Sequence, residues 1–564
     1  MWSEADAICL GVDRGDRVVA AAFRRADPTG LVELGRRPLA SGEVAAWVGR
    51  RESEAHAAGR HIRWVWSSTA TWYPRLLDAG VRVERCTDLR LCRAILSSAL
   101  DDALPPLPVW DAPHEEPAPA ALFDVVPDGA ARAEEIDETA AEYARQERVA
   151  VSSGLRLLLA AESAGSLAAA EMTSAGLPWN RGGHEQILVS ELGERTAAGR
   201  PRLIEERARE VRAALDDETA SLDSQPKLLR ALHRAGVAAE STSKWELAEH
   251  DHPAIAPLLD YKRMMRLYTA NGWGWLDEWV VDGRFRPTYV VGGVVTGRWA
   301  SSGGGALQIP RLLRPAVRAD PGWAIVDADV AQLEPRVLAA MAHDRAMAAA
   351  AAGRDLYDGV VSAGVAATRS EAKYAVLGAL YGSTTGDAAR LMPRLRRAFP
   401  RAVGLTDDAA LAGERGERVS TMLGRTSPAP GPRWEAMQQR ANASAADERS
   451  ARSAARERGR FTRNFVVQGT AAEWALAWMA DLRTRLAAFP PSEVPAPRSG
   501  PAFARRPHLA FFLHDEVIVH APADQAEAAA EAVRESAARA GRLLFGEFPI
   551  DFPLDIRIGP SAAE

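Results

Sequence analysis

The sequence is poor in cysteine and contains no long apolar run. Only three of its 564 residues are cysteine, all before position 100, which excludes a disulfide framework and argues against a thiolate zinc site. No stretch approaches the roughly 18–20 apolar residues of a membrane helix, and the first residues lack the basic and apolar regions of a signal peptide. We therefore expect a cytosolic enzyme or binding protein without a membrane partner. Any catalytic metal should be hard and oxygen-ligated.

Repeats and a phosphate-binding glycine loop are also missing. The absence of an internal repeat of roughly 20–50 residues excludes solenoids and propellers. No Walker-type loop is present, which disfavours a P-loop NTPase. The length predicts three or four domains at roughly 100–200 residues each. With 47% hydrophobic and 26% charged residues, the composition is that of a globular protein.

The net charge of −6 argues weakly against a polyanionic partner, but basic residues are unevenly distributed. Residues 449–463 contain six arginines and one acid, Glu457, and could neutralise several phosphates. A solvated helical face is an equally good reading of this run. Only four of the 69 basic residues are lysine: Lys227, Lys244, Lys262 and Lys373.

The pattern of residues changes several times along the chain. Residues 1–100 alternate short β-like runs with helical ones, which predicts an α/β domain, and a proline-rich connector follows. Residues 131–280 are predominantly helical, and 285–330 are strand-like with many glycines. Helical patterns dominate 332–400 and 435–486. The strongest strand signal, HLAFFLHDEVIVHAP, comes near the end and is followed by a helix.

An acidic segment ends the apolar strand predicted at 324–326. In WAIVDADVAQLEPRVLAAMA this strand places Asp327 and Asp329 just before a helix that begins near Gln332. A carboxylate at the end of a buried strand is costly unless it is compensated, and a divalent cation is the usual compensation. Ordinary turn chemistry is the alternative interpretation, because aspartate is common in turns.

A second acidic segment lies near the carboxyl terminus. In HLAFFLHDEVIVH two apolar runs flank His514, Asp515 and Glu516. This pattern predicts a tight β-hairpin with its acids at the tip. The same two interpretations, a cation site or a turn, apply here.

The third segment, RSEAKYAVLGALYG, has the periodicity of a helix. Arg369, Lys373, Leu377 and Tyr381 follow one another at intervals of four residues, so they share one face. A guanidinium, an ammonium, an apolar contact and a phenol suit a triphosphate and the base above it. The tryptophans, in particular Trp273, Trp275 and Trp279, are instead expected to be core residues.

In order and spacing, these three segments resemble motifs A, B and C of family A DNA polymerases. Further matches are TGRWASSGGGALQIP at 296–310, RNFVVQGTAAE at 463–473, and thumb-like sequence near 222–247. The likeness covers about 150–564. It implies an α+β right-hand polymerase fold with palm, fingers and thumb. The implied domains are an exonuclease-like α/β domain at 1–150, thumb at 151–290, palm at 291–345, fingers at 346–430, and palm again at 431–564.

The resemblance implies nucleotidyl transfer with two Mg²⁺ ions, or Mn²⁺ as an alternative. Asp329, Asp515 and the carbonyl of Val330 would bind the metal, with Glu516 as a secondary acid, and Arg369 and Lys373 would bind the triphosphate. Glu334 falls at the sugar-gate position, so the substrate should be a deoxynucleotide; its alternative reading is a helix N-terminal acid favoured by the macrodipole. The other nucleotide-binding residues implied are Gln332, Tyr357, Leu377 and Tyr381. The DNA-binding residues implied are Lys262, Arg298, Gln308, Arg425, Asn464, Gln468 and His514.

Some positions depart from the family. Leu377 replaces an aromatic residue, and Tyr357 stands where histidine is usual. The first strand lacks an Asp-x-Glu pair, Arg145 or Glu147 lies near another expected acid, and only Asp88 resembles a retained ligand. We therefore expect an active polymerase without proofreading, and no room for a 5′-nuclease domain.

The sequence thus predicts a monomeric, template-directed DNA polymerase of the bacterial cytoplasm, associated with the nucleoid, that acts on primer–template DNA and dNTPs. One alternative is a catalytically impaired DNA-binding or scaffold protein that keeps this fold. Another is a single-subunit RNA polymerase, which conflicts with Glu334.

Overall fold

The computed structural model describes residues 2–26, 30–100, 104, 134–150, 152–195, 199–302, 304–305, 309–353, 355–382 and 386–562. Its residues form two compact units. The first comprises 1–176, 287–303 and 320–560, and the second 177–286, 304–319 and 561–564. None of the helices in the described part of the chain is long and apolar enough to cross a membrane.

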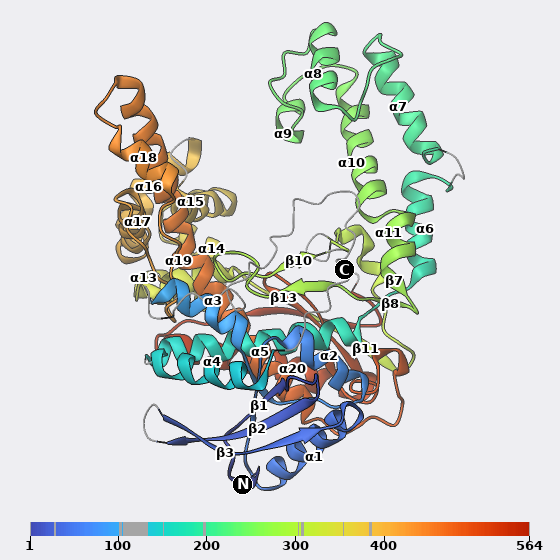
Figure 1. The fold of residues 1–564 in the computed structure, drawn as a ribbon. Coiled ribbons are helices and arrows are strands. Elements are labelled where there is room, and N and C mark those ends of the chain that lie inside the picture. The colour runs from blue at the N-terminus through green and yellow to red at the C-terminus, as the bar shows by residue number, and fades with distance from the viewer. Residues whose placement is uncertain are drawn as a thin grey trace. The chain divides into compact units, whose positions relative to one another are not determined.

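The first unit begins with a five-stranded mixed sheet in the order β3-β2-β1-β4-β5 (Figure 1). Strands β1, β2 and β3 pair antiparallel, whereas β4 and β5 continue the sheet in parallel from β1. The apolar runs at the amino terminus predicted most of these strands. The strands are β1 (Ala7–Val12), β2 (Val18–Ala26), β3 (Gly30–Leu39), β4 (Arg63–Trp66) and β5 (Arg85–Asp88).

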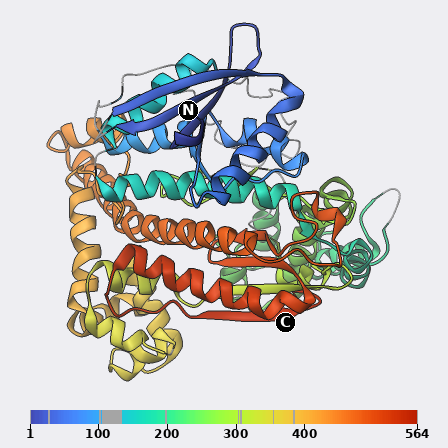
Figure 2. The same ribbon diagram turned by 90° about the horizontal axis from the view of Figure 1, so that it is seen from below.

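Helices cover this sheet and connect it to the rest of the unit. The long helix α5 packs against α2 and β5 on one side and against the 43-residue helix α19 on another, and Figure 2 shows α5 and α19 running side by side. Leu167 and Ala175 of α5 belong to the amino-terminal core. The helices are α1 (Val44–Ala57), α2 (Thr69–Asp78), α3 (Leu89–Ala99), α4 (Ile136–Val149), α5 (Ser153–Ala175) and α19 (Ala445–Ala487).

A buried ion-pair network fastens α5 to α19. Glu171 of α5 pairs with Arg483 of α19 and, at 2.9 Å, with Arg82; it also accepts the Tyr73 hydroxyl at 2.6 Å. Arg483 donates in addition to the carbonyl groups of Val83 and Glu84, both at 2.8 Å. The amino-terminal sheet and α19 are therefore parts of one packed body. Helix α5 lies in this body, although the sequence pattern places residues 151–176 with the thumb.

The second sheet of this unit has four antiparallel strands in the order β12-β13-β11-β14. Strand β11 is almost entirely buried, and β13 completely, as the apolar runs predicted. The predicted hairpin is present as β12 and β13, joined by His514 and Asp515. The strands are β11 (Trp323–Val330), β12 (His508–Leu513), β13 (Glu516–Pro522) and β14 (Leu554–Gly559), with a small pair formed by β9 (Thr288–Val290) and β10 (Ala300–Ser302).

Between β11 and β12 the chain is helical, as expected, but the predicted helix at 435–486 is broken at 440–444. Ser444 accepts the N–H of Asp447 at 3.1 Å and starts α19 anew, because such a serine satisfies an N–H group that lacks a helical partner. The helices are α12 (Leu333–Met341), α13 (Arg345–Ala351), α14 (Leu356–Ser362), α15 (Arg369–Tyr381), α16 (Gly386–Ala398), α17 (Pro400–Glu414) and α18 (Pro432–Gln439), and α20 (Ala526–Phe545) follows the hairpin.

The second unit is mostly helical and has a three-stranded antiparallel sheet in the order β6-β8-β7. Trp275 packs against Trp179 and Phe285, with ring centroids 5.3 and 5.0 Å away, and both Trp273 and Trp275 are buried, as predicted. The helices are α6 (Arg181–Leu192), α7 (Arg202–Ala214), α8 (Gln225–Arg234), α9 (Lys244–Leu247), α10 (Ile255–Asn271) and α11 (Trp273–Trp279); the strands are β6 (Leu177–Pro178), β7 (Val280–Val281) and β8 (Arg284–Phe285).

Candidate active site

Asp329 and Asp515 meet at one end of the four-stranded sheet. Asp329 is the penultimate residue of β11 and lies directly opposite Glu516, the first residue of β13. The N–H of Val330 donates to the carbonyl of Asp515 at 2.9 Å, which holds the tip of the hairpin against the end of β11. The structure thus brings together the two acidic segments that the sequence predicted to converge.

The two carboxylates are electrostatically coupled. Burial is the main cause that raises the pKa of Asp515 to about 7, and the negative charge of Asp329 is the second cause. Such a pair favours either a shared proton or a hard cation. Among the described residues, no set of three or more His, Cys, Asp or Glu side chains is arranged to hold a metal ion. Metal binding here would therefore use these two acids together with backbone or substrate oxygen atoms.

Backbone strain flanks the pair on both sides. His514, immediately before Asp515, has φ 58°, and Gln332, three residues after Asp329, has φ 51°. This left-handed conformation costs a non-glycine residue roughly 1–2 kcal/mol. Strained residues of this kind cluster at functional sites, where the surrounding structure fixes them. Burial also lowers the pKa of His514, so its imidazole is neutral near pH 7.

Glu334 lies in the first turn of α12, where three predicted site residues meet. Its carboxylate accepts the Tyr381 hydroxyl at 2.7 Å and forms an ion pair with Arg298. The side chain of Glu334 is only 13% exposed, so it is held in one position. The helix macrodipole explains an acid at this position, but the two side-chain partners are contacts that the macrodipole does not require.

Helix α15 presents the predicted face of Arg369, Lys373, Leu377 and Tyr381. Its amino terminus is fixed by a capping box between Thr368 and Glu371. Lys373 is exposed and forms no ion pair with a described residue, and Leu377 is half-buried. This face of α15 therefore offers the free ammonium group of Lys373 between the Arg369 guanidinium and the Tyr381 phenol.

Asp355 is a site residue that the sequence motifs do not indicate. Its carboxylate pairs with Arg369 at 2.7 Å and accepts the amide of Gln332 at 2.8 Å, so it joins the two motif segments. It also caps α14, accepting the N–H groups of Tyr357 and Asp358 at 2.9 and 3.1 Å. The Arg369 guanidinium lies 5.4 Å from the Tyr357 ring centroid. The sequence signal that could have indicated Asp355 is an aspartate just before a predicted helix, in GRDLYDG.

Two predicted DNA-binding residues lie one turn apart on α19. Gln468 lies near the Tyr381 phenol, and α19 packs against α15. Asn464 precedes it by four residues and is half-buried. Both side chains are amides, which can donate and accept hydrogen bonds, and Gln468 lies near Tyr381 of the Glu334 cluster.

For three other predicted DNA-binding residues the structure does not show a side chain available to DNA. The interpretation of Arg425 as a phosphate contact is wrong, because its side chain is buried in an ion pair with Glu162 at 2.7 Å. In the second unit, Lys262 donates to the carbonyl of Thr242, and burial lowers its pKa, so it stabilises a loop. Gln308 lies outside the described residues.

The basic run at 449–463 divides into two groups. Arg463 pairs with Asp407 and Arg452 with Glu448, while Arg458 donates to the Pro428 carbonyl at 2.8 Å. The remaining members are exposed and form no ion pair with a described residue: Arg449, Arg456 and Arg460. About half of the predicted basic face is thus available for phosphates.

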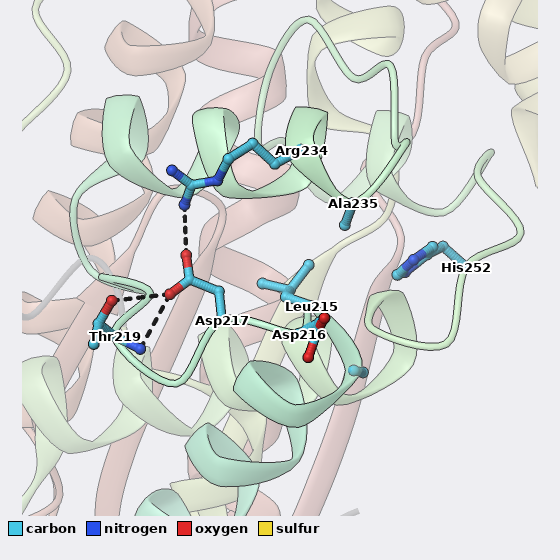
Figure 3. A pocket seen from close by; sticks show the side chains of 8 residues that line it. Leu215, Asp216, Asp217, Thr219, Arg234, Ala235 and His252 are labelled. Atoms are coloured by element: carbon cyan, nitrogen blue, oxygen red, sulfur yellow. Dashed lines mark hydrogen bonds and ion pairs between the residues drawn. The ribbon is translucent and has the colours of Figure 1, made fainter.

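A cavity of about 590 Å³ in the second unit gives no competing site (Figure 3). Its lining includes both polar and apolar side chains, and Asp217 already accepts hydrogen bonds from Arg234 and from the hydroxyl of Thr219. Its principal charged groups therefore satisfy one another.

Comparison with known proteins agrees with this geometry. The model of the family described as DNA polymerase family A matches residues 210–564. The chain is 28% identical over 341 residues to DNA polymerase I of Chloroflexus aurantiacus, covering 55% of this chain and 32% of that protein. It is 26% identical over 358 residues to the thermostable DNA polymerase I of Thermus aquaticus, covering 58% of this chain and 38% of that protein. The matches thus span about a third of the length of these relatives.

A solved structure, the POL domain of Pol1 from M. smegmatis in complex with DNA primer-template and dNTP, is also similar. Its TM-score is 0.68 at 19% identity, and the match covers 100% of this chain and 96% of that one. This likeness concerns the fold, and it confirms the predicted α+β right-hand polymerase architecture. The family match, which takes in β11, α15 and the β12–β13 hairpin, confirms the predicted relationship. The chain belongs to DNA polymerase family A.

Proposed function

We propose that this protein is a template-directed DNA polymerase that transfers nucleotides from dNTPs to a primer 3′-hydroxyl. The observation that carries the proposal is the coupled carboxylate pair, Asp329 and Asp515, at the strained end of the sheet. The relatives named DNA polymerase I and the structural neighbour with bound DNA and dNTP support it. Primer–template DNA and dNTPs are accordingly the proposed partners.

The residues present fit two divalent cations, and Mg²⁺ is the proposed metal. Asp329, Asp515 and the carbonyl of Val330 would bind them, because these are hard oxygen donors and because burial, together with the negative charge of Asp329, raises the pKa of Asp515. When bound, the cations supply a more acidic primer hydroxyl and neutralise charge on the leaving pyrophosphate. Glu516, buried beside Asp515, contributes to the negative potential that attracts them.

The triphosphate would bind the exposed face of α15. Lys373 is free to contact it directly, whereas Arg369 would share its five N–H donors between Asp355 and a phosphate oxygen. Asp355 orients the guanidinium and also holds Gln332 at the start of α12. Leu377 would form the apolar contact under the incoming base, with Tyr357 fixing Arg369 from below.

Glu334 would exclude ribonucleotides. Its carboxylate is held by Tyr381 and Arg298, so it cannot move aside for a 2′-hydroxyl group. Asn464, Gln468, His514 and Arg298 would line the paired primer terminus. Minor-groove acceptors are nearly the same for every correct pair, so donors there test geometry without reading sequence.

We further propose that the amino-terminal domain, 1–150, does not proofread. Strand β1, AICLGV, carries no acid. Asp88 accepts the N–H groups of Thr69 and Leu91, at 2.7 and 3.2 Å, as the cap of α3. Glu147 pairs with Arg25. The acids near the expected exonuclease positions thus serve structural partners.

Primer extension tests the proposal. Wild-type protein should extend a DNA primer with dNTPs and Mg²⁺, and Asp515→Ala should reduce the rate by several orders of magnitude, whereas Asp524→Ala, an exposed acid beyond the same hairpin, should not. Absence of extension by the wild type at any Mg²⁺ or Mn²⁺ concentration would instead select a DNA-binding or scaffold role. Preference for ribonucleotides would select an RNA polymerase.

A further inference from the structure

Trp245, in the short helix α9 of the second unit, is exposed to an unusual degree. Its side chain is 81% exposed, whereas the next most exposed large hydrophobic residue in the described part of the chain, Tyr374, reaches 58%. Eleven of the fifteen tryptophans in the described part of the chain are buried. The fold therefore gains almost nothing from this indole, although tryptophan normally contributes to cores and interfaces.

The backbone that carries Trp245 is firmly held. The carboxylate of Glu246 accepts the N–H groups of Glu240 and Ser241 and the hydroxyl of Ser241. The ammonium of Lys262, on α10, donates to the carbonyl of Thr242. Leu247, the last residue of α9, is fully buried. The indole thus projects from a braced segment, so binding through it would cost little ordering of the backbone.

Trp245 has one basic neighbour available to a phosphate, within a segment that also carries the acids Glu240, Glu246, Glu249 and Asp251. Lys244 adjoins it, is exposed, and forms no ion pair with a described residue. In the preceding helix, α8, Lys227 and Arg230 are likewise exposed and lack such a pair. Three of the four lysines in the chain lie in this unit, Lys262 included. This contrasts with the many arginines that pair with acids within the protein.

We propose that Trp245 and Lys244 form a binding site for an unpaired nucleotide of single-stranded DNA. The base would stack on the indole, and its phosphate would lie against the Lys244 ammonium. Aromatic stacking beside a cation is the usual way in which proteins hold single strands without reading their sequence. A base inside a duplex is already stacked on both faces and cannot use the indole in this way. The site does not depend on polymerase activity.

Fluorescence polarisation with a labelled oligo(dT) and with a fully paired DNA duplex tests the site. Trp245→Ala should weaken oligo(dT) binding about tenfold or more, because stacking on one aromatic residue changes affinity by roughly 5- to 150-fold. Trp245→Phe should retain most of the affinity. Lys244→Ala should reduce the slope of log affinity against log salt by about 0.7. Val281→Ala, another exposed apolar residue of this unit, is the matched control.

Two results would overturn the proposal. One is oligo(dT) binding by Trp245→Ala that equals that of Val281→Ala. The other is an equal reduction in affinity for oligo(dT) and for the fully paired duplex, which would make Trp245 a general DNA-binding residue. Asp515→Ala separates this site from the proposed polymerase function, since it should abolish extension and leave oligo(dT) affinity unchanged.

Discussion

The Glu334 carboxylate accepts the hydroxyl of Tyr381 at 2.7 Å, and this bond joins the first turn of α12 to the last turn of α15. The same carboxylate pairs with Arg298. The proposed sugar gate, Glu334, would be held in place by a residue that does not itself have to contact the sugar. Tyr381 would then influence substrate choice through the position of Glu334 alone.

Glu334→Ala should admit ribonucleotides. Removing the carboxylate opens space for a 2′-hydroxyl group, so the ratio of kcat/KM for dNTP over rNTP should fall at least tenfold. Tyr381→Phe should cause a smaller fall, because it removes one of the two partners that hold the gate. Steady-state incorporation of dCTP and CTP opposite a template guanine measures both. Unchanged discrimination in Glu334→Ala contradicts the assignment.

Lys373→Ala should raise the KM for dNTP more than Arg369→Ala does. A charge-assisted hydrogen bond contributes about 1.5–3 kcal/mol, or roughly 10- to 150-fold. Lys373 has no competing ion pair among the described residues, whereas Arg369 already pairs with Asp355, so its bond to a phosphate replaces an existing interaction. Single-nucleotide incorporation over a range of dNTP concentrations gives both values. A larger increase in KM for Arg369→Ala than for Lys373→Ala would show that Asp355 orients the Arg369 guanidinium without weakening its bond to the phosphate.

The pH dependence of stability should change in Glu473→Gln. Burial raises the pKa of Glu473 to about 7, while it accepts the Thr421 hydroxyl and, at 3.0 Å, the N–H of Leu423. The folded state then binds more protons than the unfolded state, so the free energy of unfolding falls as pH rises from about 4.5 to about 7. The decrease is about 3 kcal/mol at most.

Urea denaturation at pH 5 and pH 8 measures this effect. Wild type should lose more stability than Glu473→Gln between the two values. Glu417→Gln, at an exposed acid paired with Arg415, should follow the wild type. Parallel behaviour of Glu473→Gln and wild type would mean that the Glu473 carboxyl titrates normally.

Glu171→Gln should destabilise the first unit by about 3–5 kcal/mol, because it leaves Arg483 buried without its counter-ion. Burial opposes ionisation of Glu171, but Arg483 and Arg82 outweigh it and lower the pKa to about 2. The stabilisation is therefore complete above about pH 4.5 and disappears as pH falls toward 2. Thermal unfolding of wild type and Glu171→Gln at pH 7 and pH 3 checks both the destabilisation and its pH dependence. Equal melting temperatures of the two proteins at pH 7 would contradict the destabilisation.

Replacing Arg449, Arg456 and Arg460 with alanine should reduce the salt dependence of duplex binding. Every arginine that no longer neutralises a phosphate lowers the slope of log affinity against log salt by about 0.9. Arg452→Ala, at a residue paired with Glu448, should change the slope little. A slope unaffected by the triple substitution would leave this face as a solvated surface.

Local patterns predicted the centre of the candidate site. Apolar runs broken by acids located β11 and the β12–β13 hairpin, and spacing by four located α15, because both signals arise within about 15 residues. The alternation of strands and helices likewise predicted the amino-terminal α/β domain.

Long-range partners escaped prediction. The resemblance implies a phosphate-binding role for Arg425, and nothing near it in the sequence indicates Glu162, the acid that pairs with it in the interior. Asp355 was missed because its role comes from two residues on other segments, Gln332 and Arg369. The break before α19 depends on a single capping serine within an otherwise helical pattern.

The contacts of α5 give the amino-terminal domain a structural role that does not depend on any chemistry of its own. The hydrophobic core of the domain includes Leu167 and Ala175 of α5. Arg483 of α19 donates to the carbonyl groups of Val83 and Glu84 in the domain. Deleting residues 1–100 would expose the apolar side of α5 and leave donors of a buried guanidinium without acceptors. The protein therefore could not lose this domain without rebuilding the scaffold in which α5 and α19 pack together.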